Sequence, residues 1–287
     1  MRIVPIETEK TFEDIDQLLD AIKTESTCGL GNSSRAEGRS NSWDHGLGFD
    51  GSMKMIRSGW ESGAEQIKKL VDQVSEILKP ESMKMDFVHD VAGGIPDIGR
   101  SIVGLPDSMI RFSPPEFPTK PIKIVVNCTA SAGISADTLF NRGAAVGAVI
   151  DVLELRGYRC ELWIVASTKG HSARGSMAVS TKIKDSNQPL DLTSLSFCLA
   201  HPAFFRRLMF AAWETWDRDT RQKHGITSSS GYGSCVDAEI EGTDLYFECA
   251  HLNDRSRFSS PEKCAEWVKE TLINNGYVEN EDFGSDW

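Results

Sequence analysis

The sequence predicts an α/β protein, with a Rossmann-like sheet covered by helices on both faces and a smaller, mainly helical region before it. The first observation is an apolar segment at 123–127 that suits a buried strand and leads through small residues into a long helix over 136–156. The second is that strands over 160–166 and 177–184 follow this helix, and the latter alternates as a hairpin partner would. Strand, crossover helix and strand, with later helices between strands, is the order typical of α/β sheets.

The later part of the chain continues this pattern. Helices are expected near 192–200, 202–216 and 261–274, and a strand is expected near 245–250. These elements complete the predicted α/β domain, which we expect to span 121–276.

The first part of the chain predicts helices and turns. Thr11 suits the N-cap of an amphipathic helix over 11–23, and a longer helix begins near Glu61 and ends before Pro80. The segment 90–109 is dense in turn residues and is expected to be a compact connector. A Pro-rich stretch over 113–121 then predicts a boundary, so that 1–120 forms an N-terminal helical or irregular region.

The composition is that of a globular protein with an acidic balance. The chain has 287 residues, 40% of them hydrophobic, with 31 Lys and Arg against 42 Asp and Glu, a net charge of −11. This balance argues against coating duplex DNA by bulk charge, although it leaves room for a local basic groove. No apolar run approaches the ~20 residues that span a bilayer, and the first residues show no signal-peptide pattern. We therefore expect a cytoplasmic protein without a membrane partner.

Seven cysteines are scattered along the chain, and none of them forms a C-x-x-C pair. This spacing predicts neither a zinc ribbon nor a thioredoxin motif. Several of the cysteines lie in apolar segments, so we expect reduced, buried thiols.

Three polar residues follow the first strand of the predicted sheet: Asn127, Thr129 and Ser131. Ligands of open α/β sheets bind at the carboxyl ends of strands. The pattern resembles the Asp-x-Ser-x-Ser metal motif of von Willebrand factor A (VWA) domains, and the resemblance extends over about 121–275. It implies a VWA-like sheet and a Mg²⁺ site at these residues, because Mg²⁺ prefers oxygen ligands. Asn127 is neutral where the family has Asp, which implies weaker metal binding; the alternative is that these hydroxyls cap the turn and helix.

Enzyme motifs are absent from the sequence. The six histidines are isolated, and no phosphate-binding loop or nucleophile elbow occurs. Asp90, Asp97 and Asp107 lie near Arg100, but turn-capping explains such aspartates best. We expect a protein without catalytic residues and without a required cofactor.

Basic residues cluster locally despite the acidic total, as in the loop 169–174 between two predicted strands. Basic grooves with aromatic platforms hold single strands without reading sequence, at ~1–3 kcal/mol per stacked base. The alternative is that these charged loops are only solvated surface. The residues expected to bind nucleic acid are Arg35, Arg39, Trp43, Lys169, His171, Arg174, Lys182, Lys184, Arg218, Arg221 and Tyr232.

The last residues, 277–287, predict an acidic tail that ends in an aromatic residue. This tail is similar to the acidic, aromatic-tipped tail of bacterial single-stranded DNA-binding proteins, which recruits partner enzymes. An acidic stretch stays solvated, and its tip can enter an apolar pocket lined by Arg or Lys. The expected partner-binding residues are Asp282, Phe283, Asp286 and Trp287.

Nearly the whole chain also resembles a phage-borne family. The resemblance is carried by Trp43, Gly59-Trp60-x-x-Gly63-Ala64, Asp90-Val-Ala-Gly-Gly-x-x-Asp97, Arg142-Gly-Ala-Ala145 and His201-Pro-Ala-Phe-Phe-Arg-Arg207. It implies that the protein is similar to the accessory factors of Schitoviridae-type podophages. These factors bind single-stranded DNA and bring the heterodimeric phage RNA polymerase to promoters in the infected host cell. The first hypothesis is therefore a transcription factor that binds single-stranded DNA and recruits a phage RNA polymerase. The alternative is a VWA-like protein-interaction scaffold, with Mg²⁺ or an ATPase partner and without nucleic acid.

Overall fold

A computed structural model describes residues 3–24, 34–35, 41–77, 86–113, 121–227, 231–238 and 240–279 of the chain. None of the described helices is both long enough and apolar enough to cross a membrane.

The body is built on a mixed sheet in the order β13-β6-β7-β8-β2. Its strands are β13 (Leu245–Phe247), β6 (Ile122–Asn127), β7 (Cys160–Lys169), β8 (Ser176–Lys184) and β2 (Ile6–Phe12). Strands β13, β6 and β7 are parallel, whereas β8 is antiparallel to β7 and parallel to β2. The predicted β7–β8 hairpin is confirmed, and so is the α/β class.

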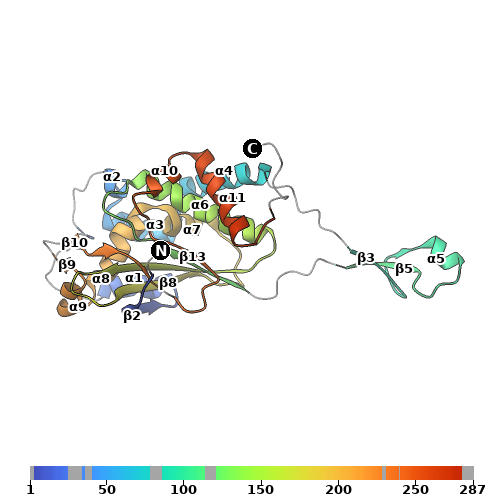
Figure 1. The fold of residues 1–287 in the computed structure, drawn as a ribbon, viewed down its shortest axis with the longest axis horizontal. Helices are drawn as coiled ribbons and strands as arrows, with labels where there is room; N and C mark the ends of the chain where they lie inside the picture. The colour runs from blue at the N-terminus through green and yellow to red at the C-terminus, as the bar shows by residue number, and fades with distance from the viewer. Residues whose placement is uncertain are drawn as a thin grey trace.

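The long helix after β6 is also confirmed. Helix α6 (Ala136–Leu155) begins after Ser135, whose hydroxyl oxygen accepts a hydrogen bond from the N–H of Thr138 at 3.2 Å. Gly143 allows α6 to approach α7 (Leu192–Ala200), because a Cβ at this position would lie 2.2 Å from the carbonyl oxygen of Leu199. The helices α4 (Glu61–Ile77) and α11 (Pro261–Asn274) pack beside α6 (Figure 1).

The helices share one core instead of covering both faces of the sheet. Alternate residues of β6 and β7, such as Ile124 and Leu162, join the buried side chains of α1 (Ile15–Thr24), α4, α6, α7 and α11 in a single cluster. The intervening residues Val125 and Val165 point to the opposite face and form a small second cluster with Ala178. The expectation of helices on both faces is therefore wrong for α1, α4, α6, α7 and α11, because the apolar side chains of these helices all join the cluster on one face of the sheet.

A π-helix interrupts the helix expected at 202–216. It spans Phe204–Met209 and continues into α8 (Phe210–Glu214). Both of its arginines are buried: Arg207 binds Asp44 with its Nε 2.7 Å from Oδ2, and Arg206 donates to the carbonyl of Ile134 at 2.7 Å. The bond between Arg207 and Asp44 attaches α2 (Asn41–Asp44) to the core.

The N-terminal segment belongs to the same sheet, which corrects two expectations. Thr11 is not a helix cap; it lies in β2, opposite Ser180 of β8. Helix α1 begins at Ile15 and is capped by Asp14, whose Oδ1 accepts from the N–H of Gln17 at 2.8 Å. Because β2, α1 and α4 contribute to the sheet and core, 121–276 do not form the α/β domain alone.

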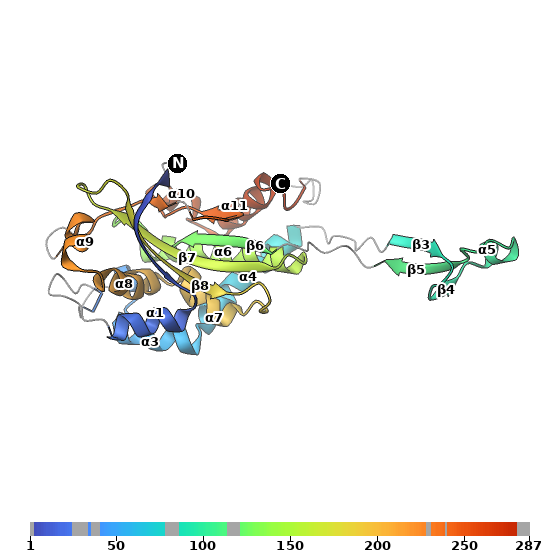
Figure 2. The same cartoon turned by 90° about the horizontal axis from the view of Figure 1, so that it is seen from below.

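A small subdomain, which we call the arm (residues 86–113), stands apart from the body in Figures 1 and 2. It consists of β3 (Asp86–Asp90), β5 (Met109–Ser113), β4 (Ile95–Pro96) and α5 (Ile98–Ile102), in the strand order β3-β5-β4. Gly93 is required in its turn, because a Cβ there would lie 2.4 Å from the carbonyl oxygen of Ile110. The turn-rich segment is thus an ordered subdomain with its own sheet and not only a connector.

The remaining described elements are the helix α3 and several shorter ones. They are β1 (Ile3–Val4), β9 (Ile226–Thr227), β10 (Gly231–Tyr232), β11 (Ser234–Cys235), β12 (Asp237–Ala238), α3 (Gly48–Ser58), α9 (Arg218–Lys223) and α10 (Asp254–Arg257). The described chain continues past 276 as part of the body, because Val278 is buried and Tyr277 packs on Tyr158. Tyr277 and Val278 are therefore not part of the expected tail, and 280–287 lie outside the described residues.

Candidate functional site

The carboxyl ends of β6 and β13 form the edge where an α/β sheet ordinarily binds ligands. Asn127, the last residue of β6, is fully buried there. Its side-chain oxygen accepts hydrogen bonds from the N–H and the hydroxyl of Thr129, at 3.1 and 2.6 Å. Its amide nitrogen lies between 2.9 and 3.1 Å from four acceptors, Ser167 Oγ, the Val236 carbonyl, Asp237 Oδ1 and Tyr246 Oη.

This network explains why residue 127 is neutral. The amide of Asn127 donates toward the buried carboxylate of Asp237, whereas an Asp at 127 would place two carboxylates about 3 Å apart. The hydroxyl of Thr129 already donates a hydrogen bond to the side-chain oxygen of Asn127. The backbone N–H of Ser131 donates to the carbonyl of Ala250 at 3.1 Å. A cation held by Asn127, Thr129 and Ser131 stays a prediction.

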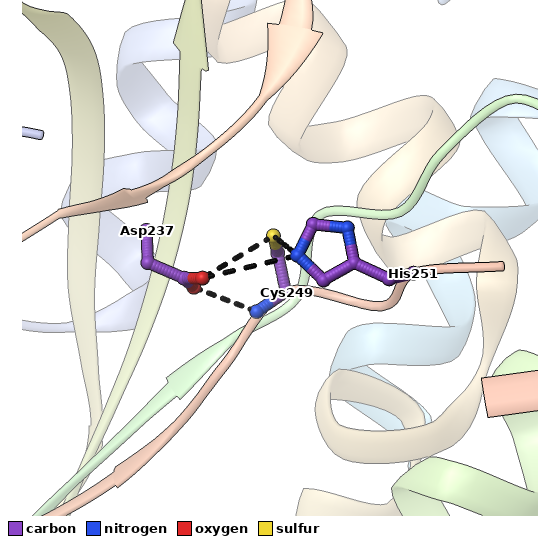
Figure 3. A group of neighbouring side chains, drawn as sticks. All are labelled: Asp237, Cys249 and His251. Carbon is purple, nitrogen blue, oxygen red and sulfur yellow. Dashed lines mark hydrogen bonds and ion pairs between the residues drawn. The ribbon is translucent and has the colours of Figure 1, made fainter. Parts of the chain in front are cut away.

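Asp237, Cys249 and His251 meet next to Asn127 (Figure 3). The Sγ of Cys249 lies 3.6 Å from Asp237 Oδ2 and 3.3 Å from His251 Nε2, and Nε2 lies 4.0 Å from Oδ2. Asp237 and Cys249 are buried, whereas the side chain of His251 is 51% exposed. Among the described residues, these side chains form a group that could hold a metal ion.

The arrangement does not suit a nucleophilic cysteine. In a Cys-His-Asp triad the carboxylate binds one ring nitrogen of the histidine and the thiol faces the other. Here the carboxylate and the thiol face the same nitrogen, Nε2 of His251. Burial, together with the charge of Asp237, raises the pKa of the Cys249 thiol, which opposes formation of a free thiolate.

Arg142 of α6 joins the two strands at this edge. Its guanidinium is buried and donates to the carbonyl of Asn127 at 3.3 Å and to the carbonyl of Glu248. Burial lowers the pKa of Arg142. Nearby, burial raises the pKa of the Cys235 thiol to about 11. The edge is therefore a polar, mostly buried and densely hydrogen-bonded part of the body.

The sequence does not predict this group, because its histidines and cysteines match no known spacing of metal ligands. The available signal was Cys249-Ala250-His251, a thiol and an imidazole two residues apart after an expected strand. The third member, Asp237, comes from β12, which is too short to predict.

Three of the predicted basic residues, Lys169, His171 and Arg174, lie at the end of β7 and in the β7–β8 loop, and Arg218 is the first residue of α9. The loop touches the other end of α9, since a Cβ at Gly170 would lie 2.2 Å from the carbonyl oxygen of Lys223. Glu7 of β2 joins the β7–β8 loop to α9, since it accepts from the N–H of Gly175 at 3.2 Å and binds Lys223. The hydrogen bond from Lys223 lowers the pKa of Glu7. A carboxylate thus lies among these basic side chains.

Other predicted nucleic-acid residues are engaged within the protein. Lys184 is 3% exposed and binds Glu154 at 2.7 Å, and Arg221 is fully buried. Burial makes the charges of these two residues inaccessible to a strand, which corrects their assignment. Lys182 is partly exposed and lies 2.9 Å from a carboxylate oxygen of Asp185.

The predicted aromatic platforms pack in the body. Trp43 and Tyr232 are half-buried and pack near Phe210, whose ring centroid lies 6.0 Å from that of Trp43 and 3.7 Å from that of Tyr232. Arg35 is exposed and its guanidinium lies 4.6 Å from the ring centroid of Phe49. The predicted residues that lie outside the described part of the chain are Arg39, Asp282, Phe283, Asp286 and Trp287.

The arm presents a different kind of surface. Nine large apolar side chains of the described chain are strongly exposed, and seven of them lie in the arm. They are Val88, Val91, Ile95, Ile98, Ile102, Val103 and Leu105. The other two, Leu155 and Leu252, lie in the body.

The fold and site define an α/β protein with a mixed sheet, a buried polar cluster at the sheet's carboxyl edge and a separate apolar arm. Residues 4–274 match a family described as a domain of unknown function (DUF7192). Because the match covers nearly the whole chain, the protein belongs to this family. No curated protein and no solved structure matches the chain.

Proposed function

We propose that the protein is a VWA-like interaction scaffold that holds a partner protein through its arm. The observation that carries the proposal is the concentration of exposed apolar side chains in residues 86–113. Such side chains lose contact with water when a partner covers them, and exposed apolar surface of this kind marks protein interfaces. The most exposed of these side chains, at 70–79%, are Val91, Ile98, Ile102 and Val103.

The arm is held in shape by its polar residues, which supports a role in binding. Asp97 caps α5 by accepting from the N–H of Arg100 at 3.1 Å, and its other oxygen lies 3.0 Å from His89 Nε2. Arg100 also binds Asp107. A surface that is ordered before binding loses less conformational entropy when the partner docks.

The VWA-like part of the proposal is supported by the arrangement of the sheet. Strand β6 is followed by α6, the chain returns through β7 and its hairpin partner β8, and β13 lies on the other side of β6. The first part of this order, a strand, the motif, a long helix and a second strand, is the part that resembles the opening of a VWA domain.

Affinity capture with two matched double variants tests the arm. Ile98→Ser with Ile102→Ser removes apolar surface from the arm, where these side chains are 70% and 79% exposed. Leu155→Ser with Leu252→Ser removes apolar surface from the body, where the side chains are 71% and 56% exposed. We expect the tagged wild-type chain and the body variant to retain the same partner from a lysate of the source organism, and the arm variant to lose it. Equal retention by both variants would contradict the proposal. Sedimentation of the purified chain shows whether the partner is a second copy.

Single-stranded DNA binding is the second candidate, favoured by the basic residues of the β7–β8 loop and α9. The exposed side chains of His171 and Arg174 project from the β7–β8 loop, and Arg218 opens α9. Phosphate contacts of this kind produce salt-dependent binding, with a slope of roughly −0.7 for each contact on a single strand.

Fluorescence anisotropy with a labelled single-stranded oligonucleotide at two salt concentrations tests this candidate. Lys169→Ala with Arg174→Ala should weaken binding and flatten its salt dependence. Lys68→Ala with Lys69→Ala removes the same charge from the exposed face of α4 and should leave both unchanged. Equal effects of the two double variants would exclude a specific groove at the β7–β8 loop.

Recruitment of a phage RNA polymerase is the further part of this candidate, and it depends on residues 280–287. Deleting these residues should spare DNA binding and abolish co-purification of the polymerase. Loss of both activities together would contradict a role specific to the tail.

A further inference from the structure

We propose that Asp237, Cys249 and His251 bind a zinc ion at the carboxyl edge of the sheet. This site is separate from the arm and does not depend on the proposed interaction. Three observations carry it: the distances among the donor atoms, the orientation of the carboxylate, and the chemistry of the three ligands.

The donor atoms are spaced as the ligands of one ion are. Zinc bonds of about 2.3 Å to sulfur and about 2.0–2.2 Å to nitrogen and oxygen place tetrahedral ligand atoms roughly 3.3–3.6 Å apart. The separations here are 3.3 Å for Sγ and Nε2, 3.6 Å for Sγ and Oδ2, and 4.0 Å for Nε2 and Oδ2. A small movement of the exposed His251 side chain would complete the geometry.

The carboxylate of Asp237 is oriented by its surroundings. Its Oδ1 accepts from the backbone N–H of Cys249 at 2.7 Å and from Asn127 Nδ2 at 3.0 Å, and it lies 3.3 Å from the hydroxyl of Tyr246. The other oxygen, Oδ2, faces Cys249 Sγ and His251 Nε2 (Figure 3). Partners that fix one oxygen and leave the other for the metal are typical of the surroundings of metal ligands.

The ligand set favours zinc over the hard cations. A thiolate and an imidazole suit Zn²⁺, whereas Mg²⁺ and Ca²⁺ prefer oxygen ligands alone. Three protein ligands leave a fourth position, and the half-exposed ring of His251 places that position toward solvent. A water molecule or another exchangeable ligand would occupy it.

Cobalt titration of the full chain, freed of metal by a chelator, tests the site. Co²⁺ bound by a thiolate gives a near-ultraviolet charge-transfer band, and we expect this band to saturate at about one ion per chain and to disappear when Zn²⁺ is added. Cys249→Ser should abolish the band, and His251→Ala should weaken Co²⁺ and Zn²⁺ binding at least about tenfold.

Two controls separate the cluster from other side chains. Cys160→Ser removes a buried thiol at the first residue of β7, and His171→Ala removes an exposed imidazole from the β7–β8 loop. Both variants should bind Co²⁺ as the wild type does. Because Cys249 is buried, circular dichroism must show that Cys249→Ser folds. If Cys249→Ser does not fold, His251→Ala still tests the site. Absence of the band in the wild type, or its retention in folded Cys249→Ser, would overturn the proposal.

Discussion

At the carboxyl edge of the sheet, polar side chains are buried and bonded to one another, whereas in the arm apolar side chains are exposed to water. Asn127 and Asp237 are at most 4% exposed and have several hydrogen-bond partners, while Ile102 of the arm is 79% exposed. Buried polar groups are tolerated where they are satisfied, so the edge adds specificity to the body. Exposed apolar groups gain nothing from folding, and a partner that covers them accounts for their presence. The difference predicts that changes in the body lower stability, and changes in the arm lower binding.

The largest loss of stability is expected where a buried charge loses its partner. Asp44→Ala leaves Arg207 buried without the carboxylate that now lies 2.5 Å from its Nη2, although Arg207 keeps its bond to the carbonyl of Ser34. Breaking a buried pair from one side costs about 3–5 kcal/mol. Urea unfolding measures this loss, and Asp50→Ala, at an exposed position of α3, should stay within about 0.5 kcal/mol of wild type. Similar results for the two variants would contradict the role of Asp44.

A loss of similar size is expected from acid. Burial between Trp60 and Phe197, with the nearby charge of His45, lowers the pKa of His201 from 6.5 to about 4. Between these values the unfolded chain binds a proton that the folded protein excludes, so the stability falls as the pH drops from 6.5 to 4, by roughly 3 kcal/mol.

His201→Asn isolates this contribution. Asparagine offers an oxygen where His201 Nδ1 accepts from the N–H of Ala203 at 3.1 Å, but it does not titrate. The unfolding free energy of the variant, measured between pH 7 and pH 4, should fall less steeply than that of the wild type. Parallel curves would mean that His201 does not contribute.

The smallest change in stability is expected in the arm. Ile98→Ser with Ile102→Ser should lower the unfolding free energy by no more than about 0.5 kcal/mol per substitution, because both side chains are already exposed. Ile150→Ala in the core of α6 should cost about 2–5 kcal/mol by comparison. Thermal or urea unfolding followed by circular dichroism compares them, and a large loss in the arm variant would mean that the arm packs on the body.

Local signals in the sequence predicted much of the body. Helices α7 and α11 have the expected bounds because Asp191 and Ser260 cap them and Pro261 opens the second. Strand β2 is not predicted, because this edge strand contains three charged residues and only two strongly apolar ones. Its residue Thr11 also suits a helix cap. Cap and strand preferences act locally, whereas β2 forms only because β8 offers a free edge.

The candidate site was less predictable for a physical reason. Strand β12 pairs with β1 and strand β13 pairs with β6, and these pairings with distant parts of the chain bring Asp237 beside Cys249. No local preference in the sequence encodes that contact. The exposure of Ile102 and its neighbours was also hidden, because an apolar residue in a sequence is expected to be buried. In both regions the tertiary arrangement decides what a residue of known chemistry does.

Site-specific photo-crosslinking tests the central claim most directly. A benzoylphenylalanine is placed at Ile102 in the arm, and a second variant carries it at Leu155, an apolar residue of the body with 71% exposure against 79% for Ile102. The account predicts a specific crosslinked partner from position 102 and none from position 155. Crosslinks of equal yield from both positions, or from position 155 alone, would contradict it.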